Sequence, residues 1–297
     1  MCNLVIFSTV TPTAKSLILE LLSTARGHTM PVSAMVEAGA LFGLSGNSLR
    51  VALARLCSHG RVERDQRGRY RLSAGAMEVQ RHVAAWSQLE QRLVTWRGGW
   101  IGVHTSDLQP VRRSLLRQRD RALGFFGFRV LTPGLWMRPD NLKGGVNELR
   151  PRLYALGLEV GAPIFAMGDL DPEMENRARR LWDGGALCRS YTKLRDALLR
   201  SAEHLREIPP ERALVESFLV GGRALRQLAF DPLLPEPIVP AGPRQALVDE
   251  LRHYDRIGRT HWRSFMRAQG VPGLESPLRG HMIDLGEPQR TGTRSQP

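Results

Sequence analysis

The feature that most constrains the fold of this chain is a series of three predicted helices followed by a short basic hairpin. Apolar residues recur with the helical period over residues 13–27, 32–42 and 45–59. Ser45 is a good N-cap for the third helix, while Gly43 and Gly60 mark helix ends. Two short strands are predicted at residues 61–64 and 69–72, on either side of a polar turn. This order is typical of a winged helix-turn-helix.

The second and third helices are spaced for close packing around a tight turn. Gly39 lets the two helix backbones approach each other, and Gly43 permits a positive φ in the turn between them. Apolar residues stand where two crossing helices must pack, and these are Ala38, Phe42, Leu44, Leu49 and Ala52. A helical projection that places Leu49 at the centre of the buried face leaves an exposed face that carries Asn47, Arg50, Val51, Ala54 and Ser58.

This exposed face and the hairpin carry side chains that suit duplex DNA. Asparagine and arginine read adenine and guanine edges in the major groove, and hairpin arginines can reach phosphates or the minor groove. The candidate DNA-binding residues are Ser45, Asn47, Ser48, Arg50, Arg55, Arg64, Arg67 and Arg69. The alternative interpretation is an ordinary helical hairpin with a solvated face, followed by a surface turn whose charges have no function.

The charge of the chain is strongly positive and locally concentrated. The formal net charge is +13, and of the 42 basic residues all but Lys15, Lys143 and Lys193 are arginine. Residues 43–75 hold seven arginines against two acidic residues, which indicates a phosphate-binding surface. Residues 177–206 carry the same excess of positive charge, spread over a predicted helix. A solvated arginine-rich surface, which GC-rich coding alone can produce, is the alternative interpretation.

The periodicity changes in the middle of the chain. A connecting helix is predicted over residues 76–95. Strands at 100–104, 125–131, 135–138 and 162–167 are then interleaved with helical stretches at 108–123 and 141–157. The resulting order, β-α-β-β-α-β, is that of a ferredoxin-like domain. A homodimer is expected, because one winged helix with few base contacts rarely gives enough specificity. Trp96 and Trp100, at the first strand, make this sheet the predicted dimer surface.

The C-terminal part is predicted to be helical over residues 172–183, 186–205, 210–229 and 243–269. Between the last two helices, the proline-rich residues 231–243 are predicted to form an extended loop that wraps over the surface. The predicted fold class is therefore α+β. Its expected parts are a DNA-binding domain at 1–75, a connecting helix at 76–95, a ferredoxin-like dimerisation domain at 96–170, a helical domain at 171–285 and a disordered tail at 286–297.

Residues that could support catalysis or metal binding are few. Cys57 and His59 stand two positions apart on a helix and therefore face different ways, and His253 and His261 are interpreted as surface or packing residues. Asp107, just after the first strand of the ferredoxin-like unit, is where some small nucleases place a metal carboxylate. A metal-dependent nuclease is therefore one alternative function, and a non-specific architectural DNA-binding protein is another. The expectation is no enzyme activity, no cofactor and no metal ion.

The cysteine count and the hydropathy predict a cytoplasmic protein. Three cysteines cannot form a disulfide framework, and an odd number fits a reducing compartment. No apolar run approaches the roughly 18 residues of a membrane span.

Several segments together resemble the PaaX-type transcriptional regulators, a family of repressors of phenylacetate catabolism and their relatives. In the N-terminal part the likeness lies in Ala14–Leu19, Phe42–Leu56 and Gly68–Ser73. Further on, it lies in Trp96–Trp100, Gly124-Phe125, Leu131–Asn141 and Asp231–Pro235, the last being similar to the family's Asp-Pro-x-Leu-Pro segment. The chain departs from the pattern at Ala241-Gly242-Pro243, where the family often has Trp-Pro-Gly.

The resemblance implies a winged helix-turn-helix, a middle ferredoxin-like (Cas2-like) domain and a helical C-terminal domain. It also implies a homodimer that represses transcription from double-stranded operator DNA. Such a dimer leaves the DNA when an acyl-CoA, typically phenylacetyl-CoA, binds. This effector is implied by the resemblance alone, because no motif in the sequence indicates a coenzyme A site.

Overall fold

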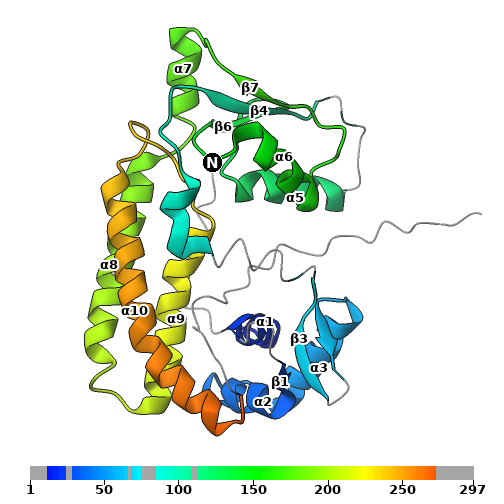
Figure 1. Cartoon of the computed structure of the whole chain (residues 1–297), viewed down its shortest axis with the longest axis vertical. Helices are drawn as coiled ribbons and strands as arrows, with labels where there is room; N and C mark the ends of the chain where they lie inside the picture. Colours follow the sequence, from blue (N-terminus) through cyan, green and yellow to red (C-terminus); the bar gives the residue numbers. More distant parts are fainter. Residues whose placement is uncertain are drawn as a thin grey trace, which may run out of the picture. The chain divides into compact units, whose positions relative to one another are not determined.

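The computed structural model describes residues 12–24, 29–65, 68–74, 76, 85–106, 108 and 113–271. They form an α+β structure that divides into two compact units (Figure 1). Unit 1 comprises residues 1–87, 193–226 and 247–284, and unit 2 comprises residues 88–192, 227–246 and 285–297. The long helices α8 (Gly184–His204), α9 (Pro210–Ala229) and α10 (Ala241–Ala268) contribute residues to both units.

The N-terminal part of unit 1 contains the predicted helices and hairpin. The helices are α1 (Ala14–Thr24), α2 (Val32–Leu41) and α3 (Gly46–Ser58), followed by strands β2 (Val62–Arg64) and β3 (Arg69–Leu72). A two-residue strand that the sequence did not predict, β1 (Met30–Pro31), pairs with β3. The antiparallel sheet therefore has the order β1-β3-β2.

A single apolar cluster holds these helices together with parts of α9 and α10. Leu49 of α3 belongs to this cluster, as do Phe218 of α9 and Trp262 of α10. The rings of Phe42 and Phe218 lie 5.0 Å apart, and those of Phe218 and Trp262 lie 5.7 Å apart. Because Phe42 follows directly after α2, these ring contacts fasten the α2–α3 turn to the C-terminal helices of the same unit.

The α2–α3 turn has the geometry that its glycines predict. A Cβ atom on Gly39 would lie 2.2 Å from Leu49 Cδ1, so only glycine permits this approach of the two helices. Gly43 has a φ of 71°. The amides of Gly43 and Leu44 donate to the carbonyls of Ala40 and Gly39, both at 3.0 Å, which forms a Schellman motif. The expected close approach and the positive φ are thus confirmed.

Replacing Gly39 with valine should lower the free energy of unfolding of unit 1 by about 1–3 kcal/mol, because the new side chain overpacks the contact with buried Leu49. Ala40→Val is the matched control, since Ala40 is exposed on the same helix. Chemical denaturation of both variants measures the difference. Equal stability of the two variants would contradict the close approach of Gly39 to Leu49.

Unit 2 is built around a four-stranded antiparallel sheet. Its strands are β4 (Trp100–His104), β5 (Arg129–Thr132), β6 (Leu135–Pro139) and β7 (Ile164–Met167), with helices α5 (Arg113–Phe125) and α6 (Gly145–Ala155) between them. The order along the chain, β-α-β-β-α-β, is as predicted, and the order in the sheet is β5-β6-β4-β7.

The second strand of this sheet begins later than residue 125, where the sequence prediction placed it. Phe125 ends α5, Gly127 has a φ of 75° in the following turn, and the strand starts at Arg129. Phe125, Phe126 and Phe128 are all buried. A short apolar run cannot distinguish a buried helix end from a strand, which explains the error.

The connecting helix predicted over residues 76–95 can be compared with the structure at residue 76 and from residue 85 onward. Residues Ala85–Arg92 form a 3-10 helix, and residues 77–84 lie outside the described part of the chain. Leu93 then forms a β-bridge with Leu142, and the Val94 amide donates to the Asn141 carbonyl at 2.9 Å. Pairing with this neighbouring segment therefore ends the helix before residue 95.

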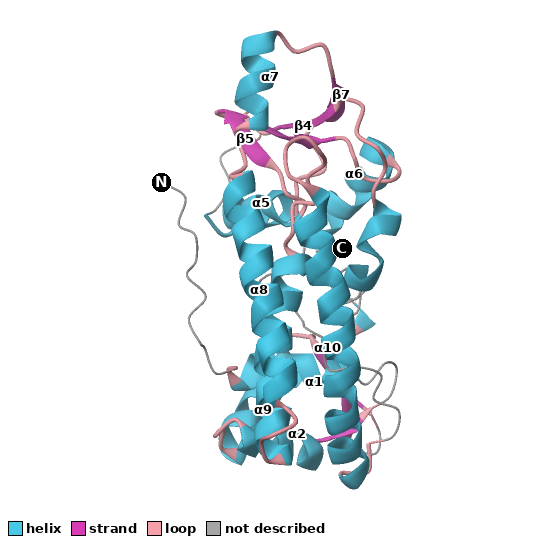
Figure 2. Ribbon diagram, turned by 90° about the vertical axis from the view of Figure 1, so that its left-hand side faces the viewer, coloured by secondary structure: helices cyan, strands magenta, loops and turns pink. Residues whose placement is uncertain are grey.

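Trp100, one of the two tryptophans at the first strand of the predicted dimer surface, is covered within its own chain. It is fully buried, and its indole N–H donates to Glu175 Oε2 at 2.8 Å. Glu175 lies on α7 (Pro172–Arg179), which stands beside the strands of unit 2 (Figure 2). Trp182 stacks on Trp100 with ring centroids 6.2 Å apart. Trp100 therefore stabilises the packing of α7 and is not available to a partner.

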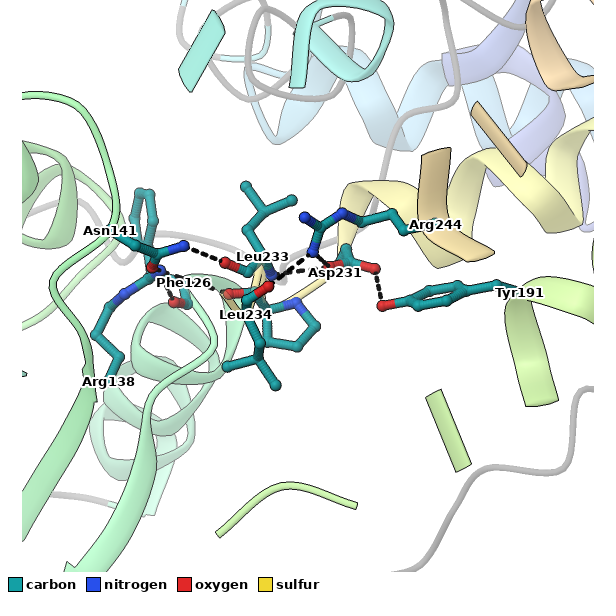
Figure 3. Close-up of polar contacts among 9 residues, drawn as sticks. Phe126, Arg138, Asn141, Tyr191, Asp231, Leu233, Leu234 and Arg244 are labelled. Carbon is teal, nitrogen blue, oxygen red and sulfur yellow. Dashed lines mark hydrogen bonds and ion pairs between the residues drawn. The ribbon is translucent and has the colours of Figure 1, made fainter. Parts of the chain in front are cut away.

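The segment Asp231–Leu234 is buried, so the first part of the predicted surface loop is in fact internal. Figure 3 shows how its backbone is paired. Asn141 Nδ2 donates to the Leu233 carbonyl at 2.7 Å, and Arg244 Nη1 donates to the Leu234 carbonyl at 3.1 Å. Side chains from other parts of unit 2 thus donate hydrogen bonds to these carbonyl groups, which in a surface loop would bind water.

The Asp231 carboxylate is the centre of this buried network (Figure 3). It accepts hydrogen bonds from the Tyr191 hydroxyl at 2.5 Å and from the Leu233 amide at 2.8 Å, and Arg244 Nη1 lies 3.8 Å away. Burial raises the pKa of Asp231, and the Arg244 charge opposes this rise. Nearby, buried Arg138 donates to the Phe126 carbonyl and to Asn141 Oδ1.

Candidate nucleic-acid interface

The exposed face of α3 is the one that the helical projection predicts. Leu49, Leu53 and Leu56 are buried in the core of unit 1. The opposite face is exposed, and it carries Asn47, Arg50, Val51, Ala54 and Ser58. Val51 keeps 44% of its surface exposed, as single apolar residues on a protein surface commonly do. This face therefore presents one amide, one guanidinium and a small apolar patch to a partner.

The N-terminus of α3 is fixed by its cap. Ser45 Oγ accepts a hydrogen bond from the Ser48 amide at 3.1 Å, and the two hydroxyl groups lie 2.9 Å apart. Both serines are exposed. The cap defines where the helix begins and therefore which residues stand in its first exposed turn.

Arg50 and Arg55 extend the basic surface of α3. A Cβ atom built on Gly46 would lie 3.2 Å from Arg50 Nη1, so the guanidinium of Arg50 lies over the first turn of the helix. Arg55 is also exposed, near the C-terminal end of the same helix. The predicted DNA-binding residues on α3 are thus all exposed.

The hairpin between β2 and β3 is closed by Asp65. Its Oδ1 accepts a hydrogen bond from the Arg69 amide at 2.8 Å, and its own amide donates to the Arg69 carbonyl at 2.8 Å. Gly68 has a φ of 72°, and the guanidinium of exposed Arg64 lies beside it. Arg67, predicted at the tip, lies outside the described residues.

Arg69 is half-buried, and its guanidinium contacts the segment before β1. Its Nη2 donates to the Thr29 carbonyl at 2.8 Å, and its Nε donates to Thr29 Oγ1 at 3.0 Å. On the same strand, Arg71 pairs with Glu63 at 3.1 Å. These contacts attach β3 to its neighbours. This structural role cannot be predicted from the sequence, because β1 is too short to be recognised by its pattern.

Cys57 and His59, which were considered for metal binding, lie within the described part of the chain. His59 Nδ1 lies 2.6 Å from the Arg55 carbonyl, and Cys57 is half-buried, with its thiol pKa raised by burial. Within the described residues, no three His, Cys, Asp or Glu side chains are grouped so that they could hold a metal ion. Asp107, the predicted nuclease carboxylate, lies outside the described part of the chain. In that described part, no helix has the length and hydropathy needed to cross a membrane.

Comparisons with known proteins give one family match and one match among solved structures. Residues 13–76, which contain α1 to β3, match the family model of PaaX-like proteins. Among solved structures, the chain is similar to uncharacterized protein Rv0674 from Mycobacterium tuberculosis, with 24% sequence identity and a TM-score of 0.54. That match covers 84% of this chain and 99% of the other. At this level of identity, the second match supports the fold alone. A search of curated proteins found no match.

Proposed function

Because residues 13–76 match the PaaX-like family, whose members are generally transcriptional regulators, we propose that this chain is a transcriptional regulator that binds double-stranded operator DNA through a winged helix-turn-helix. The observation that carries the proposal is the exposed face of α3, with Asn47 and Arg50 opposite the buried leucines. An α-helix fits the major groove, where these two residue types distinguish base pairs.

In the proposed complex, α3 enters the major groove and the hairpin lies along the flanking backbone. Asn47 and Arg50 contact base edges, while Ser45, Ser48 and Arg55 contact phosphates or sugars near the two ends of the helix. Arg64 supplies a phosphate contact from the hairpin, and Arg67 is expected to meet the backbone or the minor groove. Arg69 contributes mainly by holding the hairpin in place through Thr29.

The remaining parts of the proposal follow the family resemblance. Unit 2 contains a ferredoxin-like (Cas2-like) arrangement, supported by the sheet order β5-β6-β4-β7. The regulator acts as a homodimer and a repressor in the cytoplasm, and an acyl-CoA such as phenylacetyl-CoA releases it from the operator. The proposal includes no catalytic activity.

The test of the proposal is the loss of base preference when the α3 face is altered. A preferred site is first selected from random duplex DNA with the full-length protein, and binding isotherms then compare this site with random duplex. Arg50→Ala should cost about 1–3 kcal/mol on the selected site and should flatten the preference at one base pair. Arg212→Ala is the matched control, because Arg212 is exposed at the start of α9.

The outcome decides among the functions considered. Failure to select any site would indicate a non-specific binder, and magnesium-dependent cleavage of the duplex would indicate a nuclease. Equal losses on both duplexes for Arg50→Ala would mean that α3 does not read bases.

A further inference from the structure

A second basic surface lies on α10, outside the region that the family model matches. Five arginines follow one side of this helix at spacings of three or four residues, and these are Arg252, Arg256, Arg259, Arg263 and Arg267. From Arg256 to Ala268 the helix contains no acidic residue. Residues three or four apart are neighbours on a helix surface, so these guanidinium groups form a continuous row.

Two of the five arginines are neutralised within the helix. Arg252 pairs with Asp249, and Arg259 pairs with Asp255, both at 2.7 Å. The other three, Arg256, Arg263 and Arg267, are exposed, and we name them the α10 row.

Within the described residues, no acidic side chain is paired with the α10 row. Arg256 contacts His253 Nδ1 at 3.3 Å. For the part of the chain that is described, the α10 row makes no hydrogen bond or ion pair with an acidic side chain. Its charge is therefore available to a partner.

The α10 row is held on the same core as the predicted recognition helix. The opposite face of α10 buries Tyr254, Trp262 and Met266, and the Trp262 indole N–H donates to the Leu214 carbonyl at 3.2 Å. Trp262 and Met266 belong to the apolar cluster that also contains Leu49 of α3. The basic row and the exposed face of α3 are thus parts of one compact unit.

The stability of the helix does not account for these charges. Like charges four residues apart, as at Arg263 and Arg267, destabilise an isolated helix by about 0.2–0.5 kcal/mol per pair. The helix dipole favours cations only in the last turn, where Arg267 stands, and so it does not explain Arg256 or Arg263. A polyanionic partner would relieve this repulsion.

We propose that the α10 row contacts DNA phosphates outside the base pairs read by α3, and so extends the bound segment of the duplex. This inference rests on the proposed DNA-binding function. Arginine forks match phosphate oxygens, and such contacts need no base sequence. A membrane surface fits less well, because the exposed residues between the arginines are polar, Thr260 and Ser264, and an interfacial helix needs an apolar anchor.

The experiment measures the salt dependence of binding to random duplex DNA, which requires no known operator. The α10 variant is the full-length protein with Arg256→Gln, Arg263→Gln and Arg267→Gln combined. The matched control is the full-length protein with Arg200→Gln, Arg206→Gln and Arg212→Gln, which remove the same charge from exposed positions elsewhere in unit 1. Duplexes of about 40 and about 15 base pairs are compared, since log K falls with log salt by about 0.9 for each phosphate contacted.

On the long duplex, the affinity of the α10 variant should fall at least about tenfold. The slope of log K against log salt concentration should become shallower by about two to three, whereas it should change much less in the control. On the short duplex, the α10 variant and the control should bind alike. The base preference at the selected site should be unchanged in the α10 variant, and this separates the inference from the function of α3.

Three outcomes would overturn the inference. The first is equal affinity and equal slope for the α10 variant and the control on the long duplex. The second is an equal loss on both duplexes, which would place the α10 row at the central site. The third is unchanged DNA binding together with lost binding to vesicles of anionic phospholipid, which would assign the row to a membrane surface.

Discussion

Replacing Asp231 with alanine is expected to lower the free energy of unfolding of unit 2 by about 3–5 kcal/mol. The substitution removes the acceptor for the Tyr191 hydroxyl and the Leu233 amide. It also leaves Arg244, whose side chain is only 9% exposed, without the carboxylate 3.8 Å away. Removing one member of a buried charged network is costly, because its partners remain shielded from water but lose the hydrogen bond or ion pair that offset their desolvation.

Chemical denaturation followed by tryptophan fluorescence would measure this loss, because buried Trp100 and Trp182 both report on unit 2. Asp120→Ala is the matched control, since Asp120 is exposed on α5 of the same unit. If Asp231→Ala were no more destabilising than Asp120→Ala, the buried network would not hold the Asp231–Leu234 segment in solution.

The stability of unit 1 is expected to fall as the pH rises from about 5 to about 8, because of Glu20. This carboxyl group is buried in α1, and burial raises its pKa from 4.5 to about 8, against the opposing charge of Arg226. In that pH range the unfolded chain has lost the proton while the folded protein keeps it. Deprotonation therefore favours the unfolded state, by about 2–5 kcal/mol in total.

Glu20→Gln removes the titrating group and keeps the shape of the protonated side chain. The variant should match the original protein at pH 5 and should be more stable at pH 9. Glu37→Gln is the control, since Glu37 is exposed on α2 and its replacement should leave the pH dependence as it was. Urea denaturation between pH 5 and pH 9 tests this, and an unchanged pH dependence in Glu20→Gln would exclude Glu20 as its origin.

The candidate interface was largely predictable from the sequence, because its determinants are local. The period of the leucines in residues 45–59 predicts which face of α3 is buried, and Ser45 predicts where the helix begins. Gly39 and Gly43 predict a close approach and a left-handed turn, and both are observed. Such features depend on residues only a few positions apart, and their backbone preferences hold before any distant contact forms.

The features that the sequence did not predict depend on contacts between residues far apart in the chain. Arg69 and Arg64 are both arginines of the basic hairpin, and the sequence does not distinguish their roles. In the structure, however, Arg69 contacts Thr29, 40 positions away, because β1 brings that segment beside β3. The five prolines among residues 231–243 predicted a surface loop that would include the Asp231–Leu234 segment.

In the structure, the Asp231–Leu234 segment is buried, because Asn141 reaches it from 92 positions away and Tyr191 from 40. By itself, the sequence determined the helices, their turn and the exposed face of α3. Only the tertiary structure decided which polar groups are buried, because a polar group can leave water only where a distant partner replaces its hydrogen bonds.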